Sequence, residues 1–268
     1  MPADTKFPPL ANPAPATGTQ LEGATSEAEA SGKVREMFTQ IAPRYDLLNH
    51  LLSLQLDRLW RKRVARQLHT ILQNPDATVL DLCCGTGDLS FALAREGKSR
   101  VYGADFAHPM LVRAKQKNSS LGGDHSQPNP NALPFLEADA LRLPFADGSF
   151  DLVTTAFGFR NLANYEAGLR EIQRILKPRG TIAILEFTEP PDDFVGNVFR
   201  WYYRNVLPRI GALISGDSSA YTYLPKSVAR FFRPPELASL MSQVGYQSVA
   251  FKVWTFGTVA LHTAQSPR

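Results

Sequence analysis

Short apolar runs alternate with segments of helical period along the middle of the chain. The runs lie near residues 78–82, 100–104, 134–138, 150–156 and 180–186, and each has the length and the apolar or β-branched content of a buried strand. Helical patterns cover residues near 88–96, 108–117 and 164–176. Strands and helices that alternate in this way predict an α/β fold with a doubly wound, mostly parallel sheet.

The end of the chain follows a different pattern. Residues 245–252 and 255–264 are two extended runs with almost nothing between them. So short a connection predicts a closing β-hairpin, and therefore an antiparallel edge strand on an otherwise parallel sheet.

The chain as a whole divides into three parts. Residues 1–25 are rich in Pro, Ala, Thr and Gly and hold few large apolar side chains, which predicts a disordered tail. Residues 26–75 are interpreted as an N-terminal helical lid. Residues 76–268 are interpreted as the main domain, with a helical insertion at about 190–232 that covers the substrate.

Composition and charge narrow the classes of protein. The 268 residues, 44% of them hydrophobic, suffice for one large domain with a substantial core. The net charge of +4 is mildly basic, which suits an anionic membrane surface or nucleic acid but also an ordinary solvated surface. No apolar stretch approaches the length of a membrane span and no secretion signal stands at the N-terminus, so we expect a cytoplasmic protein with room for peripheral membrane contact.

A cofactor motif joins the first two predicted strands. Residues 79–88 read VLDLCCGTGD, and about twenty residues after the glycines Asp105 closes the run VYGAD. Gly85 and Gly87 let the backbone turn sharply into a helix and leave it bare for a ligand, while an acidic residue at the end of the next strand can accept hydrogen bonds from two ribose hydroxyls. The pattern therefore predicts a nucleotide-type ligand, against the alternative of a turn that only packs a helix on a strand.

The same loop favours one nucleotide. The third glycine of the dinucleotide fingerprint GxGxxG is missing, and Asp88 places a negative charge where a pyrophosphate would sit. An acidic DxxxGxG loop that begins at Asp81 suits a cationic ligand without phosphate, and S-adenosylmethionine is such a ligand. The adjacent Cys83 and Cys84 are interpreted as reduced, small apolar residues of this loop, in a reducing compartment, and neither as a disulfide nor as metal ligands. No metal site is expected.

Ligands of such sheets lie above the carboxyl ends of the strands, so the residues that follow strands should line the site. The third strand ends at Asp139 and Ala140, where the Asp139 carboxylate can accept a hydrogen bond from the adenine amine. The alternative role for Asp139 is to cap a helix.

Three further segments carry a resemblance. They are residues 45–60 (YDLLNHLLSLQLDRLW), 158–161 (GFRN) and 174–188 (RILKPRGTIAILEFT), and together they resemble the ubiquinone/menaquinone biosynthesis methyltransferase family from about Val34 to Thr263. The resemblance implies the class I S-adenosylmethionine-dependent methyltransferase fold, which is Rossmann-like. It also implies methyl transfer from S-adenosylmethionine to a ring carbon of a lipophilic prenyl-quinol.

The adjacent cysteines resemble one branch of that family. This branch methylates 2-phytyl-1,4-naphthoquinol in phylloquinone biosynthesis, and we take this substrate as the leading expectation. The alternatives within the family are demethylmenaquinol and a polyprenyl-benzoquinol. More distant alternatives are a nucleic-acid methyltransferase, which the basic charge alone suggests, and a non-catalytic quinone-binding protein.

The resemblance assigns cofactor contacts that agree with the positions chosen from the strand ends. They are Thr86, Asp105, Asp139 and Ala140. The full expected set of cofactor-binding residues also includes Asp81, Gly85, Gly87, Phe106 and Ala156. This chain departs from the family at three positions. Asp57 stands where many members have His, Arg179 replaces a usual Gly, and Ala156 lacks a hydroxyl with which some members contact the cofactor.

Carbon is a poor nucleophile unless an adjacent phenolic oxygen is deprotonated or polarised. Arg160 is expected to act as an electrostatic clamp for that oxygen or to orient a water molecule, since a guanidinium stays protonated and cannot act as the base. Asn161 is expected to hydrogen-bond the second ring oxygen, and Tyr45 and Asp46 to orient the ring or relay the proton. The alternative role for Asp46 is helix capping in the lid.

Partners follow from the lipophilic substrate. Residues 194–214 place apolar side chains at helical spacing with Arg200, Arg204 and Arg209 between them. This segment can wall a tunnel for the prenyl tail and contact a membrane, or it can simply belong to the core. We expect no nucleic-acid partner and allow for a homo-oligomer.

Overall fold

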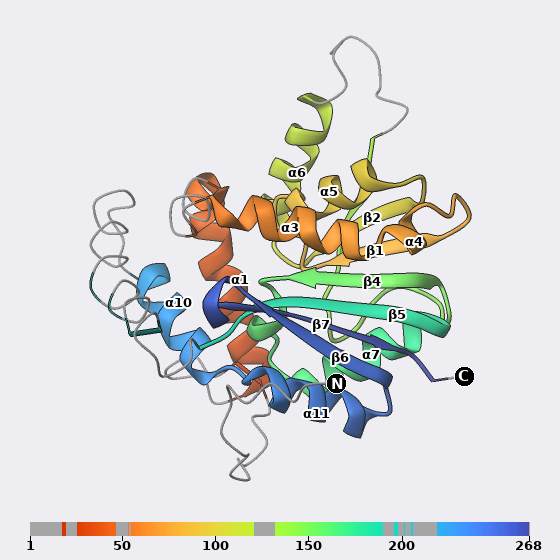
Figure 1. The fold of residues 1–268 in the computed structure, drawn as a ribbon. Coiled ribbons are helices and arrows are strands. Elements are labelled where there is room, and N and C mark those ends of the chain that lie inside the picture. Colours follow the sequence, from red (N-terminus) through yellow and green to blue (C-terminus); the bar gives the residue numbers. More distant parts are fainter. Residues whose placement is uncertain are drawn as a thin grey trace.

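The computed structural model describes residues 18–19, 26–46, 53, 55–120, 132–189, 196–197, 201, 205 and 219–267. Within them seven strands form one sheet in the order β3-β2-β1-β4-β5-β7-β6 (Figure 1). The strands are β1 (Thr78–Leu82), β2 (Arg100–Asp105), β3 (Phe135–Glu137), β4 (Phe150–Ala156), β5 (Leu176–Phe187), β6 (Gln247–Trp254) and β7 (Val259–Gln265). The first five pair in parallel, and β7 runs antiparallel to both β5 and β6.

Helices cover both faces of this sheet (Figure 1). They are α1 (Glu27–Ile41), α3 (Leu56–Gln67), α4 (His69–Leu72), α5 (Asp88–Glu96), α6 (His108–Ser120), α7 (Tyr165–Ile175), α10 (Ser219–Arg230) and α11 (Pro234–Val244), with short 3-10 turns η1 (Ala42–Arg44), η2 (Phe159–Asn161) and η4 (Thr255–Gly257). One face is covered by α3, α4 and α5, and the other by α7 and α11.

Alternation along the strands builds a core on each side. Val79 packs with Trp60 of α3 and Leu93 of α5, whereas the next residue, Leu80, packs with Ile172 of α7 on the opposite face. All five side chains are at most 2% exposed. Because both faces are buried, the strands are almost continuously apolar, which is the pattern that the sequence shows.

The predicted elements are largely confirmed. The bounds of β1, β4 and α5 match the prediction to the residue, and the fold is the predicted doubly wound α/β sheet. The one reversed strand, β7, is also present, inserted between β5 and the edge strand β6. Strand β5 begins earlier than predicted, at Leu176, and passes through Arg179 with φ of 64°. A left-handed backbone at this position explains why glycine is usual there.

Two residues of the predicted disordered tail differ from that prediction. Gly18 and Thr19 are buried, and the Thr19 backbone N–H donates to the Leu162 carbonyl at 2.8 Å. A Cβ atom on Gly18 would lie only 1.8 Å from the Ala163 carbonyl oxygen, so the Gly18 backbone packs directly on the backbone of Ala163. The other residues of the tail lie outside the described part of the chain.

The predicted lid and cover are only partly within the described residues. Helices α1, α3 and α4 occupy the region predicted as a helical lid, and α10 lies at the end of the predicted insertion. The amphipathic segment 194–214, apart from residues 196–197, 201 and 205, lies outside the described residues. Among the described helices, none is both long and apolar enough to cross a bilayer.

Candidate functional site

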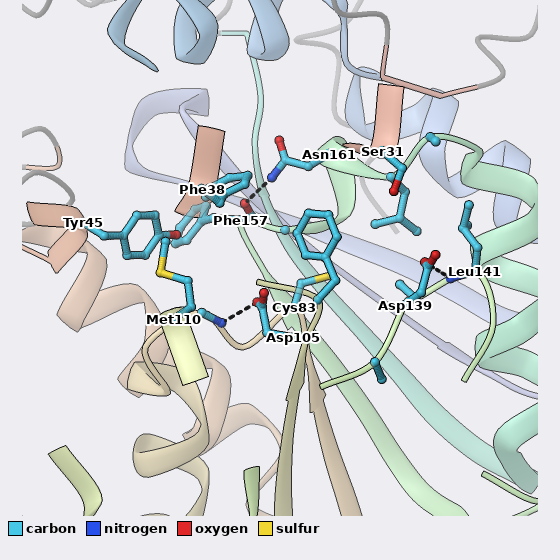
Figure 2. A pocket seen from close by; sticks show the side chains of 17 residues that line it. Ser31, Phe38, Tyr45, Cys83, Asp105, Met110, Asp139, Leu141, Phe157 and Asn161 are labelled. Carbon is cyan, nitrogen blue, oxygen red and sulfur yellow. Dashed lines mark hydrogen bonds between the residues drawn. The ribbon is translucent and has the colours of Figure 1, made fainter. Parts of the chain in front are cut away.

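A cleft opens at the carboxyl ends of β1, β2, β3 and β4, where the predicted site residues follow the strands. Its empty space, including the mouth, is about 630 Å³. It is lined by Ser31, Phe38, Tyr45, Cys83, Gly85, Asp105, Phe106, Met110, Ala138, Asp139, Ala140, Leu141, Phe157, Gly158, Asn161, Leu162 and Ala163. Figure 2 shows Cys83 and Asp105 at the strand ends, between Tyr45 and Met110 on one side and Asp139 and Leu141 on the other.

The glycine loop forms the floor of the cleft. Gly85 and Gly87 have φ of 55° and 84°, a backbone that other residues rarely adopt, and Gly87 precedes α5 as its N-cap. A Cβ atom on Gly87 would meet the Phe135 ring at 2.9 Å. Asp81 lies beneath this loop and accepts hydrogen bonds from the Ser90 hydroxyl at 2.6 Å and the Thr154 hydroxyl at 3.1 Å. Asp81 therefore fixes the loop from below and does not line the cleft.

Asp105 is held ready to accept further hydrogen bonds. One carboxylate oxygen accepts the Gly85 backbone N–H at 2.8 Å, and the other accepts the Ala107 N–H at 2.9 Å. Each oxygen has a second lone pair, so the two can also accept the two hydroxyls of a ribose. Burial raises the pKa of Asp105 to about 6 in spite of these backbone donors.

The side of the cleft beside β3 suits an adenine ring. Phe106 follows β2 and lines the cleft together with Asp139 and Ala140, which follow β3. One Asp139 oxygen accepts the Leu141 backbone N–H at 2.9 Å, and the side chain is exposed at the cleft. The second carboxylate oxygen can accept from an exocyclic amine, as predicted from the strand end.

The charge of the lining favours a cation. Among the described residues the cleft is lined by two aspartates and by no Lys, Arg or His. A pyrophosphate would find no cation there, whereas a sulfonium and an ammonium find carboxylates. Asp88 repels a phosphate less than its position in the sequence predicts, because it pairs with Lys117 at 2.7 Å and lies 3.6 Å from Arg61.

Asp46 and Thr86 join the lid to the glycine loop. The Thr86 hydroxyl donates to one Asp46 oxygen at 2.5 Å, and Lys117 of α6 donates to the other at 2.8 Å and to the Thr86 oxygen at 2.9 Å. Thr86 is buried by these contacts, and neither residue lines the cleft. The arrangement gives Asp46 a structural bond to the loop, which differs from both the catalytic role and the helix cap considered for it.

Arg160 has a partner that the sequence did not indicate. Its Nη1 donates to Glu186 at 2.9 Å and to the Phe157 carbonyl at 2.6 Å, and Arg160 and Glu186 are both buried. Glu186 also accepts the backbone N–H groups of Arg160 and Phe187. Its attraction to the carboxylate offsets the burial of the guanidinium, and the pKa of Arg160 is raised. Arg160 lies behind the cleft wall and fixes the turn after β4.

Asn161 and Tyr45 do reach the cleft. The Asn161 oxygen accepts from the Tyr223 hydroxyl of α10 at 2.8 Å, and its amide nitrogen lies 3.4 Å from the Phe157 carbonyl. Tyr45 follows η1, and its ring lies against the bare backbone of Gly85, where a Cβ atom would be 3.5 Å from the ring. Phe38 packs edge-on against Tyr45 with ring centroids 6.0 Å apart.

The predicted site residues thus fall into two groups. Tyr45, Gly85, Asp105, Phe106, Asp139, Ala140 and Asn161 line the cleft. Asp46, Asp81, Thr86, Gly87, Ala156 and Arg160 support it from behind, as far as the described residues go. Five residues of the site were not predicted: Phe38, Met110 and Phe157, which make the apolar wall, and Glu186 and Tyr223. Only Phe157 carried a signal, because it follows directly after β4.

Both cysteines of the loop are free. Cys83 lines the cleft, and Cys84 packs beside Phe135. Burial, assisted by neighbouring carboxylates, raises the pKa of both thiols well above its ordinary value, so they stay protonated. Their position agrees with the interpretation as small apolar residues.

Comparison with known proteins gives consistent results. Residues 25–266 match the model of the ubiE/COQ5 methyltransferase family. The chain is 47% identical to a demethylmenaquinone methyltransferase of Thermus thermophilus, over 86% of this chain and all of the relative. It is 37% identical to a ubiquinone/menaquinone biosynthesis C-methyltransferase of Geobacter sulfurreducens, over 88% and 90% of the two chains. A solved S-adenosylmethionine-dependent methyltransferase of Thermotoga maritima shares the fold, with a TM-score of 0.60 at 17% identity over 86% and 99% of the chains.

The raised pKa of Asp105 predicts a pH dependence of cofactor binding. Below about pH 6 the carboxyl takes up a proton, loses its charge and becomes a poorer acceptor for the ribose hydroxyls. The affinity for S-adenosylmethionine, measured by calorimetry from about pH 8 to about pH 5, should fall below pH 6 and approach a ~10-fold loss per pH unit.

Two variants decide whether Asp105 causes this dependence. Asp105→Asn should weaken binding at neutral pH by about 1.5–3 kcal/mol and abolish the decrease at acidic pH. Asp76→Asn, on the exposed loop before β1, is the matched control and should behave as the wild type. An unchanged affinity in a folded Asp105→Asn protein would refute the assignment.

The buried ion pair predicts strongly non-additive stabilities. Glu186→Leu alone leaves the Arg160 guanidinium buried without its partner and should lower the free energy of unfolding by about 3–5 kcal/mol. The double variant Arg160→Met with Glu186→Leu removes both charges and should be much closer to the wild type. Urea denaturation measures the wild type, the single variants Glu186→Leu and Arg160→Met, and the double variant, and additive losses would mean that the two side chains are not coupled.

Proposed function

The chain belongs to the ubiE/COQ5 methyltransferase family and uses S-adenosylmethionine as its cofactor, and we propose that it methylates a ring carbon of a prenylated naphthoquinol, namely a demethylmenaquinol. The observation that carries the proposal is the two-sided cleft. Acidic and backbone groups suited to the cofactor line one side, and Phe38, Tyr45, Met110 and Phe157 line the other with apolar surface suited to an aromatic ring.

The substrate named here differs from the leading expectation from the sequence. That expectation, a phytyl-naphthoquinol, rested on the adjacent Cys83 and Cys84. The relatives described above carry the names of demethylmenaquinone and ubiquinone/menaquinone methyltransferases, which favours the alternative. Cys83 lines the cleft as a free, small side chain with a protonated thiol, which gives no reason to prefer a phytyl tail.

The residues of this chain have separate tasks in such a reaction. When bound, the cofactor supplies an electrophilic methyl group on a sulfonium sulfur. Asp105 and Asp139 hold its ribose and adenine. Phe157 and Tyr45 confine the quinol ring, so that one ring carbon faces the methyl group, and the apolar wall excludes water.

The ring carbon becomes nucleophilic when the adjacent hydroxyl releases its proton to solvent and negative charge develops on the oxygen. Asn161 presents an amide N–H to that oxygen and stabilises the charge that develops on it. As the ring carbon forms its bond to the methyl group, the bond between that methyl group and the sulfonium sulfur breaks and a neutral thioether leaves. The methylated carbon then loses its hydrogen as a proton and the ring oxygen takes up a proton, which restores the aromatic quinol. The whole reaction releases one proton. Arg160, tied to Glu186 behind the wall, positions Asn161 by fixing the turn and does not touch the ring. This replaces the direct clamp expected from the sequence.

The lipophilic substrate also implies contact with a membrane. A lipophilic quinol must be collected from a bilayer, so we propose peripheral contact with the membrane that holds the quinone pool. The basic net charge of +4 supports contact with an anionic surface.

The proposed function is tested by transfer of a labelled methyl group to a panel of reduced quinols. Demethylmenaquinol should be methylated on a ring carbon faster than a polyprenyl-benzoquinol. The same quinones in the oxidised form should not react, because they have no phenolic hydroxyl to polarise. Product mapping by mass spectrometry identifies the methylated ring position.

A pair of variants connects this activity to the cleft. Asn161→Ala should reduce kcat by roughly 10²–10³, the loss typical of one oxyanion donor, while S-adenosylmethionine affinity changes little. Asn74→Ala, on an exposed turn before β1, is the matched control. Absence of methyl transfer to every quinol by a folded, cofactor-binding protein would contradict the proposal.

A further inference from the structure

A row of three polar side chains leads from the N-terminal segment into the cleft. Thr19 lies within 3.2 Å of the Tyr223 hydroxyl, measured between the two oxygens, and that hydroxyl lies 2.8 Å from the Asn161 oxygen. The three residues come from distant parts of the sequence, and Thr19 and Asn161 are buried. Only Asn161 lines the cleft.

The hydrogen bonds of this row have a single consistent direction. The Phe157 carbonyl can only accept, so the amide nitrogen of Asn161 must face it, and the amide oxygen must face Tyr223. Tyr223 therefore donates its one proton to Asn161. Since that proton is used, the Thr19 hydroxyl must donate to the Tyr223 oxygen.

This direction determines what Asn161 offers to a substrate. Its oxygen is occupied by Tyr223, and one of its two amide hydrogens points to Phe157. The remaining hydrogen has no acceptor among the described residues and is available at the cleft. We propose that Tyr223 and Thr19 are positioning residues that hold the Asn161 amide with its N–H toward the quinol oxygen, an inference that rests on the proposed function.

The surroundings of Thr19 and Tyr223 support a positioning role. The Thr19 backbone N–H donates to the Leu162 carbonyl at 2.8 Å, so Thr19 is anchored to the residue directly after Asn161. One turn beyond Tyr223 on α10, the Ser227 oxygen accepts from the Arg160 side chain at 3.4 Å. The same face of α10 thus contacts both polar residues of the GFRN turn.

An amide that is held in place costs less to reorganise when charge develops on the substrate than an amide that rotates freely. Without the Tyr223 hydroxyl, the Asn161 amide can turn its oxygen toward the cleft, where it would repel a phenolate. The N-terminal segment, whose composition predicts only disorder, then contributes to the rate of the reaction through Thr19.

The test is a set of double-mutant cycles on demethylmenaquinol methylation. Tyr223→Phe should lower kcat by roughly 10-fold, less than the ~10²–10³ expected for loss of the donor itself, and Thr19→Val by about 3-fold. The KM for S-adenosylmethionine should not change. Thr19→Ser, which keeps the hydroxyl, should restore the wild-type rate. In the Asn161→Ala background, neither Tyr223→Phe nor Thr19→Val should lower kcat further.

Control variants separate positioning from a general effect on folding. Tyr246→Phe removes a buried hydroxyl that donates to the Leu169 carbonyl at 2.9 Å, away from the cleft, and should lower stability without lowering kcat. Thr70→Val makes the change of Thr19→Val on an exposed site of α4.

The outcomes distinguish this inference from the function on which it rests. Equal losses of kcat for Tyr223→Phe in the wild-type and Asn161→Ala backgrounds would overturn the positioning role while leaving the function intact. A folded wild-type protein that methylates no quinol would overturn the function itself.

Discussion

The buried ion pair of Arg160 and Glu186 fixes the turn on which one wall of the cleft is built. Phe157, at the start of this turn, has φ of 61°, and its carbonyl receives hydrogen bonds from the side chains of both Arg160 and Asn161. Gly158 packs so closely on the loop after β1 that a Cβ atom would lie 2.3 Å from the Cys83 Cβ. The turn therefore cannot move without displacing the floor of the cofactor site, and the two halves of the cleft are coupled through this contact.

Two kinds of surface meet in the cleft because parallel strands end at the same edge of the sheet. The strands β1 and β2 end in backbone turns and carboxylates, which suit a small polar and cationic cofactor. The turn after β4 and helices α1 and α6 add aromatic and apolar side chains, which suit a ring that must be kept from water. Selection against phosphate ligands comes from the lack of cations along the described lining, since Lys117 and Arg61 are engaged by Asp88 outside it.

The sequence predicted those features of the fold and the site that depend on residues close together in the chain. Continuous apolar runs and glycines predicted the bounds of β1, β4 and α5 to the residue. The rule that ligands lie at strand ends predicted that Gly85, Asp105 and Asp139 line the cleft. Contacts between distant segments could not be found in this way. Glu186 reads as one more residue of a strand, and the buried positions of Gly18 and Thr19 lie in a segment whose composition indicates no structure. Arg160 was predicted as a site residue, but its partner Glu186, and hence its positioning role, was not.

The central claim is that this chain methylates a quinol ring in the cell. Lipid-quinone profiling of cells that lack the protein tests it most directly, with mass spectrometry of the extracted quinones. The account predicts that the methylated naphthoquinone disappears, that its precursor lacking the ring methyl group accumulates, and that the wild-type gene reverses both changes while an Asn161→Ala version does so poorly. An unchanged quinone pool in these cells would contradict the account.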